Sequence, residues 1–171
     1  MQGKNKVLSL SKDKYKSIIG TAFFLGYMPV MPGTFGALPG IAIYYLLWYF
    51  LSSSYLLVGL LISIGILIFL TYYLTPWAVA YWKSEDPSQF ILDEIIGFLF
   101  VPVFYQTGSV SDITITGFVL FRVLDIIKIP PANYVDKNIK GATGIILDDI
   151  ISAGYAALCL YLMSIYNFKL I

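Results

Sequence analysis

The chain contains no histidine and a single cysteine among its 171 residues. The missing imidazole excludes every mechanism that needs a histidine base, nucleophile or metal ligand, including hydrolysis by a Ser-His-Asp triad. Cys159 has no second cysteine to pair with, so an intramolecular disulfide is excluded as well. Because Cys159 lies in an uncharged apolar run, we interpret it as a small hydrophobic packing residue.

Charged residues are also scarce. They make up 12% of the chain, against about 25% in soluble domains, while hydrophobic residues make up 58%. This composition predicts a membrane protein, and the length suits one domain, residues 1–171. The net charge of +1 provides no general basic surface, so we expect no nucleic-acid partner. The oligomeric state is left open.

Long uncharged runs set the expected architecture. Residues 17–82 contain no charged side chain and are long enough for about three crossings at roughly 20 residues each. Prolines and glycines in residues 28–36 predict a turn, and a polar loop follows at 84–89. We expect an all-α, polytopic helical membrane protein with about four spanning helices and short partial or interfacial helices. The expected helices cover residues 18–28 (partial), 37–51, 55–75, 90–104, 113–127 and 143–166, with loops at 105–112 and 130–140.

The N-terminal segment, residues 1–16, is basic. By the positive-inside rule it predicts a cytoplasmic N-terminus. The five lysines on which this prediction depends are Lys4, Lys6, Lys12, Lys14 and Lys16.

Acidic residues are concentrated within apolar segments of the second half. Residues 91–149 have a local net charge of −3, from seven acidic and four basic residues. A charge at mid-bilayer costs about 2.5 to 3.5 kcal/mol on insertion scales, so such residues usually pair or bind ions. The ordinary alternatives are helix N-terminal charges, side chains that reach the interface, and an i,i+3 ion pair between Arg122 and Asp125. Carboxylates without histidine favour a hard cation, Mg²⁺ first and Mn²⁺ second, together with a phosphorylated substrate.

Two places could hold the phosphate. Arg122 and Lys128 supply positive charge, and Arg122 can donate two parallel hydrogen bonds. The segment PGTFG, with Gly33, Thr34 and Gly36, could direct backbone N–H groups toward an anion, although taken alone it is better explained as a plain turn between two membrane helices.

Four segments in this order resemble the phosphatidylglycerophosphatase A family over roughly residues 20–165. They are Pro32–Gly36 (PGTFG), Leu92–Gly97 (LDEIIG), Phe121–Lys128 (FRVLDIIK) and Gly144–Gly154 (GIILDDIISAG). The resemblance implies an all-helical, magnesium-dependent bacterial lipid phosphatase that converts phosphatidylglycerophosphate to phosphatidylglycerol. The sequence departs from the family pattern after Lys128, where Ile129 precedes Pro130, and at Ala142, where a second glycine is expected.

Carried over by motif, the resemblance puts the family's charged positions on Asp93, Glu94, Arg122, Asp125, Lys128, Asp148 and Asp149. Together with the residue chemistry above, these positions lead us to expect five catalytic carboxylates, a metal site and a phosphate site. The catalytic residues are Asp93, Glu94, Asp125, Asp148 and Asp149. The metal ligands are a subset of Asp93, Glu94, Asp148 and Asp149. The phosphate-binding residues are Arg122, Lys128, Gly33, Thr34 and Gly36, with Asp125 orienting Arg122.

We therefore expect a multi-pass enzyme of the bacterial cytoplasmic (inner) membrane. Its active site faces the cytoplasm, and its partners are the lipid substrate and bilayer lipids. Two alternatives explain the same acidic residues: a divalent-cation carrier lined by carboxylates, and a catalytically silent lipid-binding protein. Whether one or two metal ions bind, and whether water or an aspartate attacks phosphorus, is left open.

Overall fold

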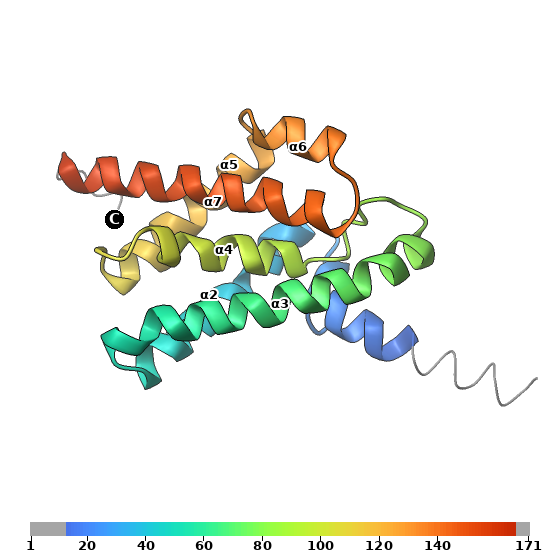
Figure 1. Ribbon diagram of the computed structural model, residues 1–171, viewed down its shortest axis with the longest axis horizontal. Coiled ribbons are helices and arrows are strands. Elements are labelled where there is room, and N and C mark those ends of the chain that lie inside the picture. Colours follow the sequence, from blue (N-terminus) through green and yellow to red (C-terminus); the bar gives the residue numbers. More distant parts are fainter. Residues whose placement is uncertain (1–12, 167–171) are drawn as a thin grey trace, which may run out of the picture.

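A computed structural model describes residues 13–166, and all regular structure in that range is helical, as expected (Figure 1). A helix at residues 13–20 comes first, and the first 12 residues, with Lys4, Lys6 and Lys12, lie outside the described range. The elements that follow are η1 (Leu25–Tyr27), α2 (Pro32–Phe50), α3 (Ser53–Trp82), α4 (Leu92–Phe104), the π-helical η2 (Asp112–Gly117), α5 (Phe118–Ile127), α6 (Ala132–Asn138) and α7 (Ala142–Ile165).

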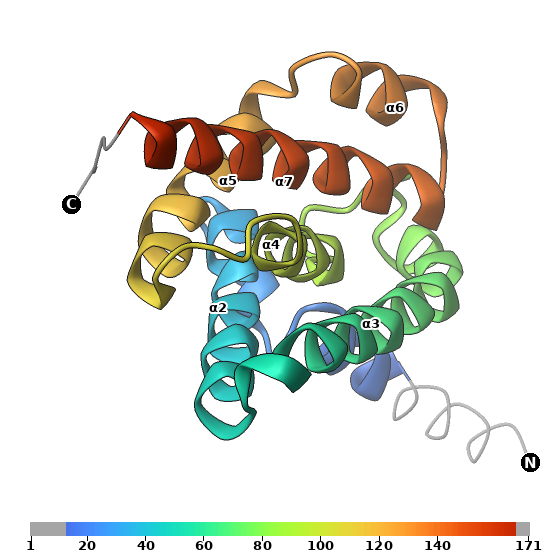
Figure 2. The same cartoon turned by 60° about the vertical axis from the view of Figure 1, so that its left-hand side comes forward.

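Helix α4 forms the centre of the bundle and is surrounded by α2, α3, α5 and α7 (Figure 2). Ile96, Phe98 and Leu99 are fully buried, as expected for a helix that is apolar on all sides. Gly97 permits the close approach of its neighbours, because a Cβ there would lie 2.6 Å from Cζ of Phe121 and 2.9 Å from Cβ of Asp149. The start of α4, with its acidic pair, is therefore held in the middle of one end of the bundle.

Four expectations about the elements were wrong. Helix α2 begins at Pro32 and not at residue 37, because proline at a first helical position lacks only an N–H that would have no intrahelical acceptor. Helix α3 continues through Pro76 to Trp82. The segment expected as a loop at 130–140 contains α6, and the helix expected at 113–127 is divided into η2 and α5.

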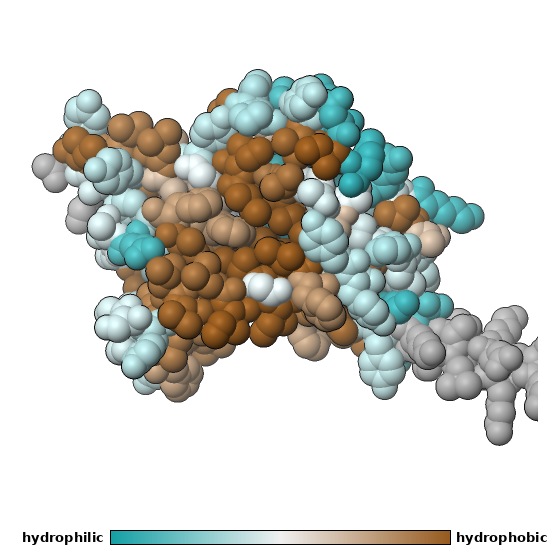
Figure 3. Space-filling view, in the orientation of Figure 1, coloured by the Kyte–Doolittle hydropathy of each residue, from teal (hydrophilic) through white to brown (hydrophobic). Residues whose placement is uncertain are grey.

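The bundle exposes a large apolar surface. Within residues 13–166, two helices are long and apolar enough to cross a membrane, α3 and α7. Only 17% of the most apolar stretch of α3 is buried, and apolar side chains gather over the middle of this helix (Figure 3). Ile62 and Phe69 are 59% and 68% exposed. An apolar surface of this extent needs lipid around it, which indicates a membrane protein. The expected number of four crossings stays a prediction.

Charge is distributed unequally between the two ends of the bundle. One end contains the helix at 13–20, the loop from 83 to 91, the starts of α4 and α7, the end of α5, and α6. All charged side chains among residues 13–166 belong to these segments, or to the connection between α6 and α7 in the case of Lys140, except Asp112, which begins η2 at the opposite end. The candidate site lies at the charged end.

Candidate active site

A cavity of ≈ 280 Å³ opens at the charged end of the bundle. Its walls come from the starts of α2 and α4, the loop before α4, the end of α5 and the first half of α7. Segments separated by more than 100 residues thus contribute to one site. The lining residues are Met31, Pro32, Gly33, Asp86, Ser88, Phe90, Asp93, Glu94, Arg122, Asp125, Ile126, Lys128, Ile145, Asp148 and Asp149.

Three aspartates converge in this cavity. One carboxylate oxygen from each of Asp125, Asp148 and Asp149 lies within 4.8 Å of the other two, and the three residues are buried. Oδ1 of Asp148 and Oδ2 of Asp149 have no hydrogen-bond partner within the described part of the chain. Buried carboxylate oxygens that lack a partner are costly unless a cation or proton neutralises them. The all-oxygen donor set fits a hard cation.

Asp125 connects the three aspartates to the guanidinium group of Arg122. It comes three residues after Arg122 on the buried side of α5, and its Oδ2 lies 2.8 Å from Nη1 of Arg122. The expected i,i+3 ion pair therefore forms, and Asp125 is at the same time close to Asp148 and Asp149. Nε of Arg122 is buried and has no partner among residues 13–166, which leaves a donor for an anion.

Gly33 brings the first turn of α2 against the same guanidinium. A Cβ at this position would lie 2.5 Å from Nη2 of Arg122 and 2.5 Å from Oε1 of Glu94, so no side chain fits without displacing them. The N–H of Gly33 also belongs to a first helical turn, where it has no intrahelical acceptor. Gly33 therefore lines the cavity at a place where a side chain would not fit, and its role in phosphate binding stays a prediction.

Lys128 ends α5 and is held between two carboxylates. Its Nζ lies 2.6 Å from Oδ1 of Asp136 and 2.6 Å from Oδ2 of Asp148. Burial alone lowers the pKa of Lys128, but the hydrogen bonds to Asp136 and Asp148 outweigh burial and raise the pKa above its ordinary value. The backbone of Lys128 has a φ of 51°, a left-handed conformation that glycine adopts more easily. The residue that ends α5 in this conformation thus also contributes an ammonium group to the cavity.

Asp93 and Glu94 project from the first turn of α4 into the cavity. Burial raises the pKa of Glu94 to about 7, against the opposing charge of Arg122. Burial, followed by the charge of Glu94, raises the pKa of Asp93 well above its ordinary value. The carboxyl group of Glu94 is thus able to hold a proton near neutral pH.

The other two residues of the PGTFG segment do not line the cavity. Gly36 packs against Ile91, since a Cβ there would lie 2.8 Å from Cβ of Ile91. The N–H of Thr34 donates to the carbonyl oxygen of Met31 at 2.9 Å, so this donor is already used. The assignment of Thr34 and Gly36 to phosphate stays a prediction without support from the lining of this cavity.

Sequence reasoning missed several residues around the site. Asp136 binds Lys128, while Asp86, Met31 and Ile126 line the cavity. Their sequence signals were weak, because Asp86 and Asp136 lie in polar segments with other charged residues and Ile126 is one of many apolar residues. The proximity of these residues depends on the packing of α5, α6 and α7.

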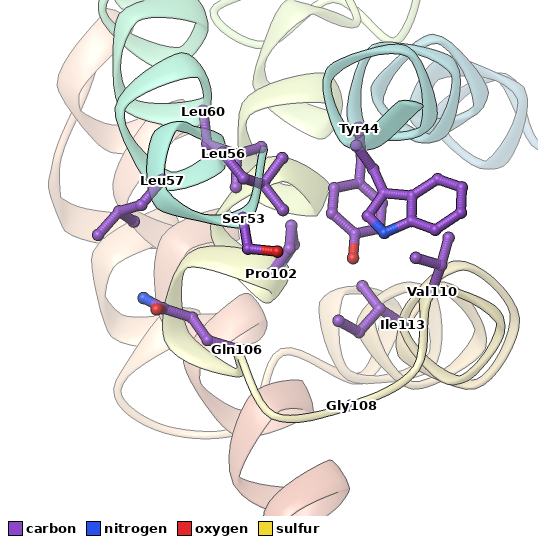
Figure 4. Close-up of a pocket in the computed structure, with 11 residues that line it drawn as sticks. Tyr44, Ser53, Leu56, Leu57, Leu60, Pro102, Gln106, Gly108, Val110 and Ile113 are labelled. Atoms are coloured by element: carbon purple, nitrogen blue, oxygen red, sulfur yellow. The ribbon is translucent and has the colours of Figure 1, made fainter. Parts of the chain in front are cut away.

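A second cavity, of ≈ 220 Å³, lies at the opposite end of the bundle, between the end of α2, the start of α3 and the end of α4 (Figure 4). Tyr44, Ser53 and Gln106 supply its polar groups, and no charged residue is among those that line it. The groups that could bind a metal and phosphate are therefore at one end of the molecule.

The chain is similar in sequence to proteins of one known family. A family model described as Phosphatidylglycerophosphatase A matches residues 18–164. A protein of that name from Escherichia coli (strain K12) is 32% identical over 84% of this chain and 80% of the relative. A protein of the same name from Haemophilus influenzae is 27% identical over 84% and 85%. A Bacteroides thetaiotaomicron protein, provisionally named a phosphatidylinositol-3-phosphatase, is 32% identical over 81% and 87%.

No solved structure matches the chain. The family match covers every segment that contributes to the cavity, from Met31 in the first wall to Asp149 in the last. The cavity, its three aspartates and its two basic residues are therefore features of a chain that belongs to the phosphatidylglycerophosphatase A family.

Proposed function

We propose that this protein is a phosphoric monoester hydrolase that converts phosphatidylglycerophosphate to phosphatidylglycerol and phosphate in phospholipid biosynthesis. The family match and the names of the relatives from E. coli and H. influenzae support the activity. The observation that carries the proposal is the convergence of Asp125, Asp148 and Asp149 with Arg122 and Lys128 in one cavity. This set of charges suits a phosphate monoester and a cation that neutralises it.

Asp125, Asp148 and Asp149 would hold Mg²⁺, with Mn²⁺ as the second choice, and Asp93 and Glu94 line the same cavity nearby. A bound ion of this kind would supply charge neutralisation at the phosphate and an acidified water molecule. The partnerless oxygens of Asp148 and Asp149 support the assignment of the ion to the triad.

The side chains of the protein would perform the remaining tasks. Arg122 and Lys128 offset the negative charge that develops on the phosphoryl oxygens, and Asp125 keeps the guanidinium in place. In the reaction, the oxygen of water forms a bond to phosphorus, the ester P–O bond breaks, and the proton that the water loses passes to the departing alkoxide. Glu94, with a pKa raised to about 7 by burial, is the carboxyl group best suited to exchange that proton.

We place the protein in the bacterial inner membrane, with about four crossings and with the cavity facing the cytoplasm. The concentration of charge at the cavity end, which includes Lys14, Lys16, Lys83, Lys137 and Lys140, supports this orientation under the positive-inside rule. The exposed apolar surface of α3 supports membrane residence.

Phosphate release tests the proposal. The protein in detergent is given short-chain phosphatidylglycerophosphate, with and without Mg²⁺, alongside phosphatidylinositol 3-phosphate as a competing headgroup. We expect metal-dependent release with a higher kcat/KM for phosphatidylglycerophosphate, and a loss of about 100-fold or more in kcat for Asp149→Asn. Asp112→Asn, at the end of the bundle opposite the cavity, is the matched control and should stay within about twofold.

Near-normal, metal-dependent turnover by Asp149→Asn would disprove the assignment of the site. A kcat/KM for phosphatidylinositol 3-phosphate higher than that for phosphatidylglycerophosphate would mean that the substrate carries a different headgroup from the one proposed. Divalent-cation uptake into vesicles without any phosphate release would instead favour a carrier.

A further inference from the structure

Helix α5 presents its charged and apolar residues in the reverse of the arrangement found in a soluble bundle. Arg122 and Asp125 are 9% and 8% exposed, whereas Val119, Val123 and Ile126 are 48%, 47% and 58% exposed. In water this helix would bury charge and expose hydrocarbon, which is unfavourable on both counts. In a bilayer both choices are favourable, because the apolar side meets lipid and the charged side meets the cavity. The outer side of α5 is therefore a lipid-facing surface.

This apolar surface is continuous with the cavity. Val119, Val123 and Ile126 follow one another at helical spacing and form a stripe that extends about 10 Å along α5 at 1.5 Å per residue. Its last residue, Ile126, is more than half exposed and also lines the cavity. The stripe thus ends where the buried charges begin.

The other side of the opening is also apolar. Met31, the residue before α2, lines the cavity and is 52% exposed. It lies next to Val30, which is 65% exposed, and α2 and α5 are neighbours in the bundle. Met31 and Ile126 are therefore apolar groups at the margin of a cavity whose interior contains Arg122, Lys128 and the aspartates.

We propose that lipid substrate enters the cavity sideways from the bilayer between Met31 and Ile126, with an acyl chain lying along the stripe Val119, Val123 and Ile126. This inference rests on the proposed function and specifies how that function reaches its substrate. A lipid with a phosphate monoester at one end and hydrocarbon at the other matches this arrangement. Its phosphate would meet the basic and acidic groups inside the cavity, and its hydrocarbon would meet the exposed aliphatic side chains outside. The bilayer is the source of such a molecule at this position.

Enzyme kinetics provide the first test. Ile126→Ser should raise the KM for dioleoyl phosphatidylglycerophosphate in mixed micelles, relative to the KM for the deacylated headgroup, by about tenfold, because a contact with hydrocarbon is lost. Ile62→Ser is the matched control, since Ile62 on α3 is 59% exposed and lies away from the cavity. It should leave the ratio of the two KM values unchanged. An unchanged ratio in Ile126→Ser would overturn the proposal.

Lipid binding provides a second test that does not need turnover. Ile126→Trp and Ile62→Trp are placed in phosphatidylcholine vesicles with a chelator, and the signal of the native Trp48, Trp77 and Trp82 is subtracted. Dibromostearoyl phosphatidic acid should quench the tryptophan at 126 at least twofold more than dibromostearoyl phosphatidylcholine at equal mole fraction. The two lipids should quench the tryptophan at 62 equally.

Equal quenching at 126 would show that no phosphomonoester lipid is held there and would overturn the proposal. If the wild-type protein released no phosphate from any lipid while preferential quenching at 126 persisted, the proposed reaction would fail and the lateral lipid site would stand.

Discussion

The absence of a side chain at Gly33 is what allows the guanidinium of Arg122 and the carboxylate of Glu94 to meet the first turn of α2. We expect Gly33→Ala to lower kcat/KM by about 10- to 100-fold, because a Cβ at 2.5 Å from both groups must displace them. The measurement is phosphate release from phosphatidylglycerophosphate, accompanied by thermal unfolding to show that the bundle persists.

Gly65→Ala is the control for this substitution. Gly65 lies within α3 and a Cβ there would meet nothing within 4 Å, so the variant should keep full activity and equal or slightly greater stability. Equal activities for Gly33→Ala and Gly65→Ala would mean that the contact with Arg122 and Glu94 has no role in turnover.

Single residues also show what the sequence could predict. Arg122, Asp148 and Asp149 were identifiable because charge inside an apolar segment needs an explanation, and the structure places all three in the cavity. Asp136 was not identifiable, because it lies near Lys137 and Lys140 in a polar segment where charge is ordinary. Its contact with Lys128 depends on tertiary structure that no local pattern encodes.

At the scale of elements, Lys128 connects three helices. It ends α5, and its ammonium group binds Asp136 of α6 and Asp148 of α7. A second contact, from the hydroxyl of Tyr155 to the carbonyl oxygen of Pro130 at 2.6 Å, joins α7 to the connection between α5 and α6. Helix α6 therefore contributes one of the two carboxylates that contact the ammonium group of Lys128.

We expect Asp136→Asn to lower kcat/KM by about tenfold, because the charge-assisted hydrogen bond that positions Lys128 is weakened. Asp136→Glu should recover part of the loss, since it restores the charge with a longer side chain. Glu85→Gln is the control. It breaks the Lys140–Glu85 pair, whose side chains are 61% and 70% exposed, and such a pair contributes little.

Steady-state kinetics and thermal unfolding of the three variants test whether Asp136 positions Lys128. If Asp136→Asn behaved like Glu85→Gln, or if Asp136→Glu recovered nothing while unfolding at the same temperature, Asp136 would not be positioning Lys128.

Element boundaries were predictable where hydrophobic runs are long and not where proline interrupts them. The apolar runs that became α3, α4 and α7 were recognised from length and composition. Pro32 was interpreted as part of a turn although it begins α2, and Pro76 lies within α3. Proline is compatible with a helix when the affected N–H has no acceptor, or when the surrounding helices compensate for the lost bond. Sequence alone does not show which of these applies.

At the scale of the whole molecule, the two ends of the bundle differ in charge, and this difference fixes an expected orientation. The lysines of the described range lie at the cavity end, while the loop from 105 to 111 at the other end is uncharged. A charged end resists translocation, whereas an uncharged loop crosses at low cost, so the cavity should remain in the cytoplasm. The phosphate released there would enter the cytoplasm directly.

Labelling of single cysteines tests this orientation. In a Cys159→Ala background, Lys137→Cys marks the cavity end and Thr107→Cys marks the uncharged loop, and both positions are exposed. A membrane-impermeant maleimide should label Thr107→Cys in right-side-out membrane vesicles and Lys137→Cys in inverted ones. The Cys159→Ala protein alone gives the background. The reverse pattern would place the cavity on the outer face of the membrane. Labelling of both cysteines from the same side would mean that the cavity end and the opposite end of the bundle do not lie on opposite faces of the bilayer. Helix α5 would then not have the orientation in the membrane that the lateral entry of lipid requires.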